Sequence, residues 1–348
     1  MYNMFSKHYK VKHMANIRDV ATKAGTSITT VSKVLSNDPT FKVTESTRES
    51  IYQAVKDLNY VFNKKSKNTK KFKIGCIMAM TSVKYADPYF TSILSGIEEE
   101  AKISNCNVSY HINYDELENP KKLEEMYAMN LDGLIIMETL PKAVLHDIMT
   151  NITHVIAVDN YRNIMNSVGF DHFESTKQVM KHLIKNQYKR IAYIGGGAPN
   201  IDMYDTKRLI MYRESLRIAN LTYDDAIVKD CYWDLDLCAI QTNELLNLSP
   251  RPDVIFAGSD SLAQIVLGQI HKNNLRCPDD IAVVGFNNLN FSSYLVPALT
   301  TIDVPSKRMG QIAVKRIVEM IQNDDQSIYS IILPTELIKR ESTREVVK

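Results

Sequence analysis

Two kinds of hydrophobic pattern divide the chain. Between residues 16 and 60, apolar positions recur at helical spacing in three short stretches, and Asn16, Ser27 and Thr44 each precede one as a capping residue. From residue 74 onward, short apolar runs of strand length alternate with longer amphipathic stretches. The first pattern predicts three helices. The second predicts parallel β-sheets with helices on both faces.

The N-terminal helices have the arrangement of a DNA-binding motif. Gly25 lies between the first two and can adopt the left-handed backbone that ends a helix. The exposed face of the second carries Thr29, Thr30, Ser32 and Lys33, which can bond to phosphates and base edges. We therefore predict a helix-turn-helix that binds duplex DNA. The alternative is a small three-helix domain whose hydroxyls only face water.

The strand and helix pattern after residue 74 predicts two α/β units in tandem, hence two lobes with a cleft between them. Ligands of such folds bind at the carboxyl ends of the strands. The fold class is thus α/β, with a three-helix head and a two-lobed domain built on parallel sheets.

Charge separates the same two regions. Residues 1–71 carry 14 Lys and Arg against 5 Asp and Glu, a net charge of +9. The whole chain has 42 against 40, so residues 72–348 carry 28 against 35, or −7. A basic head suits a polyanion such as DNA. The five cysteines lack metal-ligand spacing and predict buried, reduced thiols in a cytoplasmic protein, without a metal or cofactor.

Specific motifs carry a family resemblance over roughly residues 15–345. The head pattern DVA, AG, S, TVS, VL, TR and Y is similar to the DNA-binding head of the lactose/galactose repressor (LacI/GalR) family. The pieces DGLIIM, VGFD, KRIAYIGG, RPDVIFAGSDSLA and PDDIAVVGFN resemble its effector domain, which is related to periplasmic sugar-binding proteins. This implies a sequence-specific regulator of carbohydrate genes, expected to be a repressor, controlled by a small molecule.

The resemblance also implies domain limits. We expect a disordered basic extension at 1–15, the helix-turn-helix at 16–62, a linker at 63–73 and the effector-binding domain at 74–348. One lobe would comprise about 74–160 and 290–322, and the other about 161–289 and 323–345. The linker holds six lysines, and Thr69 stands where the family has a leucine that wedges into the minor groove. A polybasic tether is therefore favoured over a kinking hinge helix.

Site residues follow by position. In the head, base-edge contacts are implied for Ile28, Thr29 and Lys33, and Lys33 replaces a common arginine, which softens specificity there. The remaining predicted DNA contacts are Ser27, Thr30, Ser32, Asn37, Asn63, Lys64 and Lys67. The predicted effector contacts are Asp87, Tyr89, Phe90, Asp159, Arg208, Trp233, Ser259 and Asn287.

An aromatic platform beside charged hydrogen-bonding groups favours a sugar effector, with a purine as the alternative. We expect no enzyme. The glycines of IAYIGGGAPN lack the spacing of the dinucleotide fingerprint, and no nucleophile elbow is found. A free-standing sugar-binding protein would not explain residues 16–60. We expect a homodimer on operator DNA, with no membrane association. The sequence does not specify which molecule is the effector, whether it acts as an inducer or a corepressor, or which operator sequence is bound.

Overall fold

The computed structural model describes residues 15–36, 41–58, 60, 71–79, 87–117, 119–159, 164–198 and 201–345. Contacts divide the chain into two compact units, residues 1–70 and residues 71–348. Within the described residues, no helix combines the length and the apolar composition needed to cross a bilayer. Residues 1–14 of the extension predicted at 1–15, and most of the predicted linker, lie outside the described residues.

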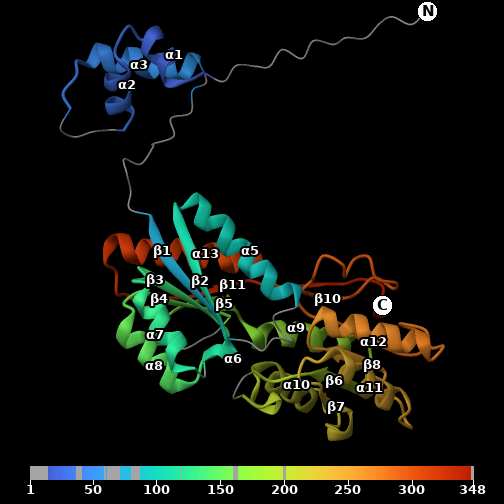
Figure 1. The fold of residues 1–348 in the computed structure, drawn as a ribbon. Helices are drawn as coiled ribbons and strands as arrows, with labels where there is room; N and C mark the ends of the chain where they lie inside the picture. Colours follow the sequence, from blue (N-terminus) through green and yellow to red (C-terminus); the bar gives the residue numbers. More distant parts are fainter. Residues whose placement is uncertain are drawn as a thin grey trace, which may run out of the picture. The chain divides into compact units, whose positions relative to one another are not determined.

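The first unit, the head, contains three helices around a small core (Figure 1). They are α1 (Ile17–Lys23), α2 (Ile28–Leu35) and α3 (Glu45–Asp57). The predicted caps are confirmed: Asn16 forms a capping box with Asp19, and Ser27 and Thr44 cap the next two helices. Gly25 has the expected left-handed backbone, with φ +62°. The buried core consists of Val20, Ala21, Val31, Val34, Ile51 and Ala54.

The second unit, the body, contains a six-stranded parallel sheet. Its order is β11 (Ser330–Leu333), β5 (Asn166–Phe170), β4 (Val155–Val158), β3 (Gly133–Met137), β1 (Phe72–Met78) and β2 (Cys106–Asn113). Helices α5 (Pro88–Ile103) and α13 (Ser306–Asn323) cover one face. The other is packed by α7 (Pro120–Ala128) and α8 (Lys142–Asn151), with α6 (Tyr114–Leu117) beside them. Residues on both faces are buried, because alternate positions of each strand enter different cores.

A four-stranded parallel sheet forms the second lobe. Its order is β7 (Val228–Asp230), β6 (Ile191–Gly195), β8 (Val254–Ala257) and β9 (Ala282–Val284). Helices α9 (His172–Lys185) and α10 (Lys207–Ile218) pack on one face, and α11 (Leu235–Leu246) and α12 (Asp260–Lys272) on the other. The 3-10 turns η1 (Met203–Asp205) and η2 (Asp225–Ile227) precede α10 and β7. The prediction of two parallel α/β lobes is confirmed.

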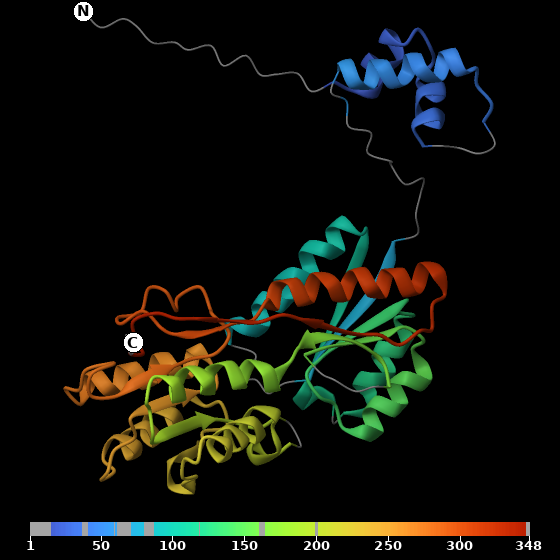
Figure 2. The ribbon, with the colours of Figure 1, turned by 180° about the vertical axis from the view of Figure 1, so that it is seen from behind.

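The structure differs from the predicted lobe boundaries. Strands β5 and β11, which the prediction assigned to the second lobe, pair in the first sheet. Segment 290–303 stays with the second lobe, where β10 (Thr301–Asp303) pairs with β12 (Glu336–Ile338). The chain therefore crosses between lobes after β5, before α13 and after β11 (Figure 2). Strand pairing places β5 in the first lobe, because it lies between β4 and β11 and pairs in parallel with both. In this position every residue of β5 is buried.

Candidate functional site

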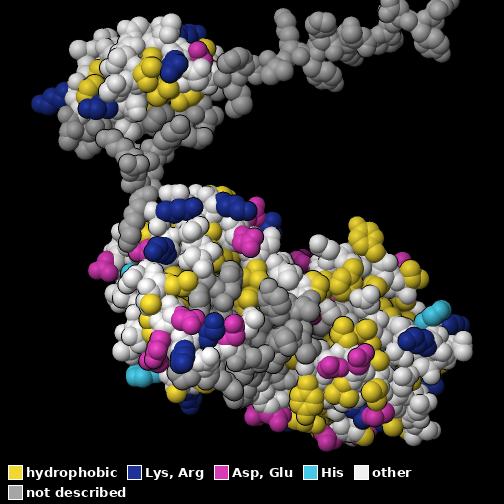
Figure 3. Space-filling view, viewed as in Figure 1, with side chains coloured by type: hydrophobic (Ala, Val, Ile, Leu, Met, Phe, Trp, Pro, Cys, Tyr) yellow, Lys and Arg dark blue, Asp and Glu magenta, His cyan; other side chains and the backbone are white. Residues whose placement is uncertain are grey.

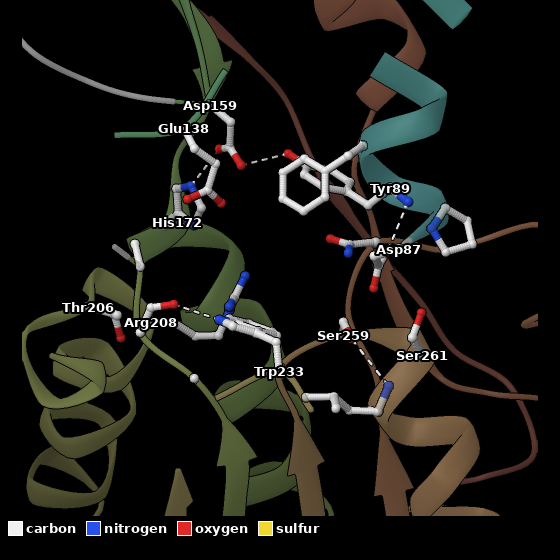
Figure 4. A pocket seen from close by; sticks show the side chains of 18 of the residues that line it. Asp87, Tyr89, Glu138, Asp159, His172, Thr206, Arg208, Trp233, Ser259 and Ser261 are labelled. Atoms are coloured by element: carbon white, nitrogen blue, oxygen red, sulfur yellow. Dashed lines mark hydrogen bonds and ion pairs between the residues drawn. The ribbon is translucent and has the colours of Figure 1, made fainter. Parts of the chain in front are cut away.

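A cavity of about 540 Å³ lies between the two lobes of the body. This volume is within the range of small-molecule sites. Strand ends and helix N-termini of both lobes form its walls (Figure 4). Every predicted effector residue lines it: Asp87, Tyr89, Phe90, Asp159, Arg208, Trp233, Ser259 and Asn287. The folded chain thus brings together residues that are spread over 200 positions of sequence.

The first-lobe wall centres on Asp159, the residue directly after β4. The Tyr89 hydroxyl donates a hydrogen bond to Asp159 Oδ2 over 2.8 Å, and His172 Nε2 lies 2.9 Å from Oδ1. Burial alone would raise the pKa of Asp159, but the His172 imidazole and the Tyr89 hydroxyl outweigh it and hold that pKa below its usual value. The carboxylate is therefore ionised and fixed in direction, ready to accept hydrogen bonds from ligand hydroxyls.

The second-lobe wall presents an aromatic surface. The Trp233 indole N–H donates to the Gly197 carbonyl over 2.6 Å, which holds the ring in place. The Arg208 guanidinium lies 4.2 Å from the centre of the Phe286 ring and 5.9 Å from that of Trp233. A flat ring beside a guanidinium can stack on a sugar ring while the charged group bonds to its hydroxyls.

The run of glycines after β6 has a packing role. A Cβ on Gly196 would lie 2.8 Å from Trp233 Cδ1, and one on Gly258 would lie 3.2 Å from its Cη2. Both glycines therefore leave room for the indole ring, and the Gly197 carbonyl accepts its hydrogen bond. This explains the glycine-rich segment without a phosphate-binding loop.

Two predicted residues also have a backbone role at the cavity. Ser259 is buried and caps α12, because its Oγ accepts a hydrogen bond from the Leu262 amide over 3.2 Å. Asn287 has a left-handed backbone with φ 108°. The neighbouring Asp260 is fully buried and accepts hydrogen bonds from Ser292 and Thr301.

Sequence reasoning missed several residues of the cavity wall, among them Glu138, His172 and Lys207. Glu138 follows β3 as Asp159 follows β4, so the rule that ligands meet the carboxyl ends of strands already pointed to it. His172 is the first residue of α9, adjacent to the chain's crossing between lobes. Burial lowers the pKa of Lys207, although the negative charges of Asp171 and Asp159 act to raise it.

In the head, the predicted base-contacting residues lie on α2. Ile28 is 43% exposed, and Ser27 and Thr29 are also exposed, whereas Thr30, Ser32 and Lys33 are partly buried. An exposed isoleucine on a polar face suits contact with base methyl groups. The Lys33 Nζ lies 4.9 Å from the centre of the Phe41 ring. The predicted contacts Asn37, Asn63, Lys64 and Lys67 are outside the described residues.

All five cysteines are free, and four of them are buried, as predicted. The part of the chain that the structure describes holds no cluster of His, Cys, Asp and Glu suited to a metal ion.

Comparison with known families matches both units of the chain. Residues 16–63 match the bacterial regulatory proteins of the lacI family, and residues 180–343 match the periplasmic binding protein-like domain. The chain belongs to the LacI family. It is therefore a DNA-binding transcription regulator, and the resemblance inferred from its motifs is confirmed.

Whole-chain relatives support the LacI assignment. The NTD biosynthesis operon regulator NtdR of Bacillus subtilis (strain 168) is 28% identical over 341 residues, covering 95% of this chain and 100% of that protein. The transcriptional repressor PurR of Photobacterium profundum is 26% identical, covering 96% and 100%. The Lac repressor dimer bound to operator and the anti-inducer ONPF has a TM-score of 0.69 at 25% identity, covering 94% and 99%.

Proposed function

We propose that this chain is a cytoplasmic repressor of carbohydrate-metabolism genes whose affinity for operator DNA is set by a sugar bound between its lobes. Relatives with different names have nearly the same sequence identity to this chain, so sequence identity does not indicate which effector it binds. The observation that carries the proposal is the cavity itself, which has a volume of about 540 Å³. Trp233 and Arg208 lie on one of its walls, opposite Asp159 on the other (Figure 4). These groups suit a ligand with an apolar face and several hydroxyls. The chain would act by binding alone, without catalysis.

Operator binding is assigned to the exposed face of α2. The experiment is selection of the full chain on a randomised duplex library, followed by affinity measurement on the selected sequence. Replacing Thr29 or Lys33 with alanine should each weaken binding by about 1–3 kcal/mol, roughly 5- to 150-fold, and relax preference at one base position. Arg217→Ala, an exposed change in the body, serves as the control. Unaltered affinity in both head variants would contradict the assignment.

Effector binding is assigned to the cavity. A thermal-shift screen of sugars and nucleobases should give a sugar that stabilises the protein by mass action. Arg208→Ala should weaken that ligand by tenfold or more, on the order of 1.5–3 kcal/mol for a lost charged hydrogen bond. Arg217→Ala on the same helix should leave the shift unchanged. A shift that survives Arg208→Ala would remove Arg208 from the site, and a nucleobase hit would favour the purine alternative.

A two-fold dimer would place two heads on a pseudo-palindromic operator. Hydrophobic side chains gather on the lobe that carries α11 and α12 (Figure 3). Tyr294 and Val296 are 83% and 93% exposed, and Ile240 is 58% exposed. Exposed apolar groups of this size favour a subunit interface. A stable monomer at micromolar concentration in sedimentation would contradict the dimer.

Regulation follows from linkage between the two sites. If the effector changes the geometry of the lobes and thereby weakens operator binding, the operator must weaken effector binding by the same factor. Measuring effector affinity with and without the selected duplex gives both the sign and the size of this coupling.

A further inference from the structure

A fully buried tyrosine, Tyr193, lies on β6 next to the second-lobe wall of the cavity. Its ring packs in the core, with its centre 5.9 Å from that of Tyr212 and 5.4 Å from that of Phe256. A phenylalanine would make the same ring contacts without taking a polar group out of water. The Tyr193 hydroxyl therefore needs an explanation other than core packing.

Two glycines at the ends of β6 and β8 make room for this hydroxyl. A Cβ on Gly195 would lie 2.5 Å from Tyr193 Oη, and one on Gly258 would lie 3.2 Å from it. The Cβ on Gly258 would also lie 3.2 Å from Trp233 Cη2. The hydroxyl thus occupies a space formed by the two strand ends, beside the indole ring that forms part of the cavity wall.

The nearest cation to this hydroxyl is the guanidinium of Arg208. Burial raises the pKa of Tyr193, and the positive charge of Arg208 acts to lower it, so the two groups are neighbours. Among the described residues, neither Tyr193 Oη nor Arg208 Nε has a hydrogen-bond partner at normal geometry. Buried polar atoms without a partner are rare and costly. A donor and an acceptor that could satisfy each other therefore lie side by side.

We propose that the Tyr193 hydroxyl positions Arg208 for the effector, by accepting a hydrogen bond from Nε–H when the effector engages the outer N–H groups. This rests on the proposed function, in which Arg208 contacts a sugar. A guanidinium presents its N–H donors in one rigid plane, so fixing one donor fixes the direction of the others. The Phe286 ring, with its centre 4.2 Å from the guanidinium, supports its face. Tyr193 acts through Arg208, because its side chain is fully buried.

Two tyrosine variants with opposite expected effects test the proposal. The full chain is titrated with D-glucose, D-galactose, D-ribose, maltose and cellobiose, and Kd is measured for each sugar that stabilises it. Tyr193→Phe should raise Kd about fivefold or more, while the Tm without sugar stays the same or rises. The control is Tyr212→Phe, whose lost hydroxyl donates to the Ile191 carbonyl over 2.7 Å. It should lower the Tm and leave Kd unchanged.

Fluorescence provides a second measurement, which needs no sugar. Trp233 is the only tryptophan of the chain, so the intrinsic emission reports on the surroundings of the cavity wall. Its ring centre lies 5.9 Å from the Arg208 guanidinium. Tyr193→Phe should shift this emission in the same direction as Arg208→Ala. When the two changes are combined, the emission should be that of Arg208→Ala alone, because the hydroxyl acts through the guanidinium.

The outcomes separate this inference from the sugar proposal. An unchanged Kd in Tyr193→Phe, or a further change of emission when it is added to Arg208→Ala, overturns the inference and leaves the sugar proposal intact. Sugar binding that survives Arg208→Ala contradicts the effector assignment instead. If none of the five sugars stabilises the chain, the sugar proposal fails for them, and the emission of the single and combined variants decides whether Tyr193 positions Arg208.

Discussion

The head and the body of this chain place their functional residues in opposite ways. The head carries a net charge of +9 within residues 1–71, and those of its candidate contacts that the structure describes lie on one helix, α2, or at its N-cap. The body carries −7, and its candidate contacts line a cavity between lobes. The surface of α2 is formed by residues that are adjacent in the sequence, whereas the cavity is lined by residues from many separate segments. The difference determines how each region responds to mutation.

The two regions also differ in the size of their cores. Among its described residues the head has six buried hydrophobic side chains, whereas one body cluster alone joins side chains of both sheets to α5, α9, α10 and α13. Small domains bury a smaller share of their surface and have less stability to lose. We therefore expect equal local losses to unfold the head first.

Matched core truncations give the largest expected effect. Ile51 in the head and Ile156 in β4 are both fully buried. Each replacement by alanine should cost about 2–5 kcal/mol through lost burial and a cavity. Ile51→Ala should unfold the head and abolish DNA binding at 25 °C, whereas Ile156→Ala should leave a folded body with a lowered Tm. Calorimetry and duplex binding measure both outcomes, and an intact head in Ile51→Ala would break the comparison.

A buried carboxyl group should make body stability depend on pH. Burial raises the pKa of Asp260 from 3.8 to about 6, against hydrogen bonds from Ser292 and Thr301 that lower it. Because the folded-state pKa is above the unfolded value, its contribution is full below pH 3.8 and is lost as pH rises through about 6.

The measurement is urea unfolding of the body in the unsubstituted chain and in Asp260→Asn. The difference in free energy of unfolding between them should shrink by about 2–3 kcal/mol from about pH 4 to about pH 7. The exposed change Asp236→Asn on α11 is the control and should give a constant difference. A constant difference for Asp260→Asn as well would show that this carboxyl does not titrate in this range.

Helix capping gives the smallest expected effect and sharpens the comparison of the two regions. Asn16 accepts a hydrogen bond from the Arg18 amide over 2.8 Å, and Asp234 accepts one from the Leu237 amide over 2.7 Å. Alanine at either position should cost about 1 kcal/mol. Only Asn16→Ala should visibly increase hydrogen exchange throughout its region, because the head has less stability in reserve. Equal exchange in the head with and without Asn16 would contradict this.

Local signals in the sequence determined the head almost completely. Caps at Asn16, Ser27 and Thr44, the turn at Gly25 and the helical spacing all act within a few residues, so the three helices were predicted with the correct N-termini. The alternation of strands and helices in the body was predictable for the same reason. Resemblance of whole motifs added the positions of the cavity residues.

Only the tertiary structure decided how the body strands are shared between lobes. The local sequences of β5 and β11 do not indicate that these strands pair with each other, although more than 150 residues separate them. The register of a parallel pair depends on the partner strand, which the local sequence does not specify. The same holds for Glu138 and His172, whose place at the cavity depends on where β3 ends and where α9 begins after the chain crosses. Short-range physics fixed the elements, and long-range packing fixed which side chains face the ligand.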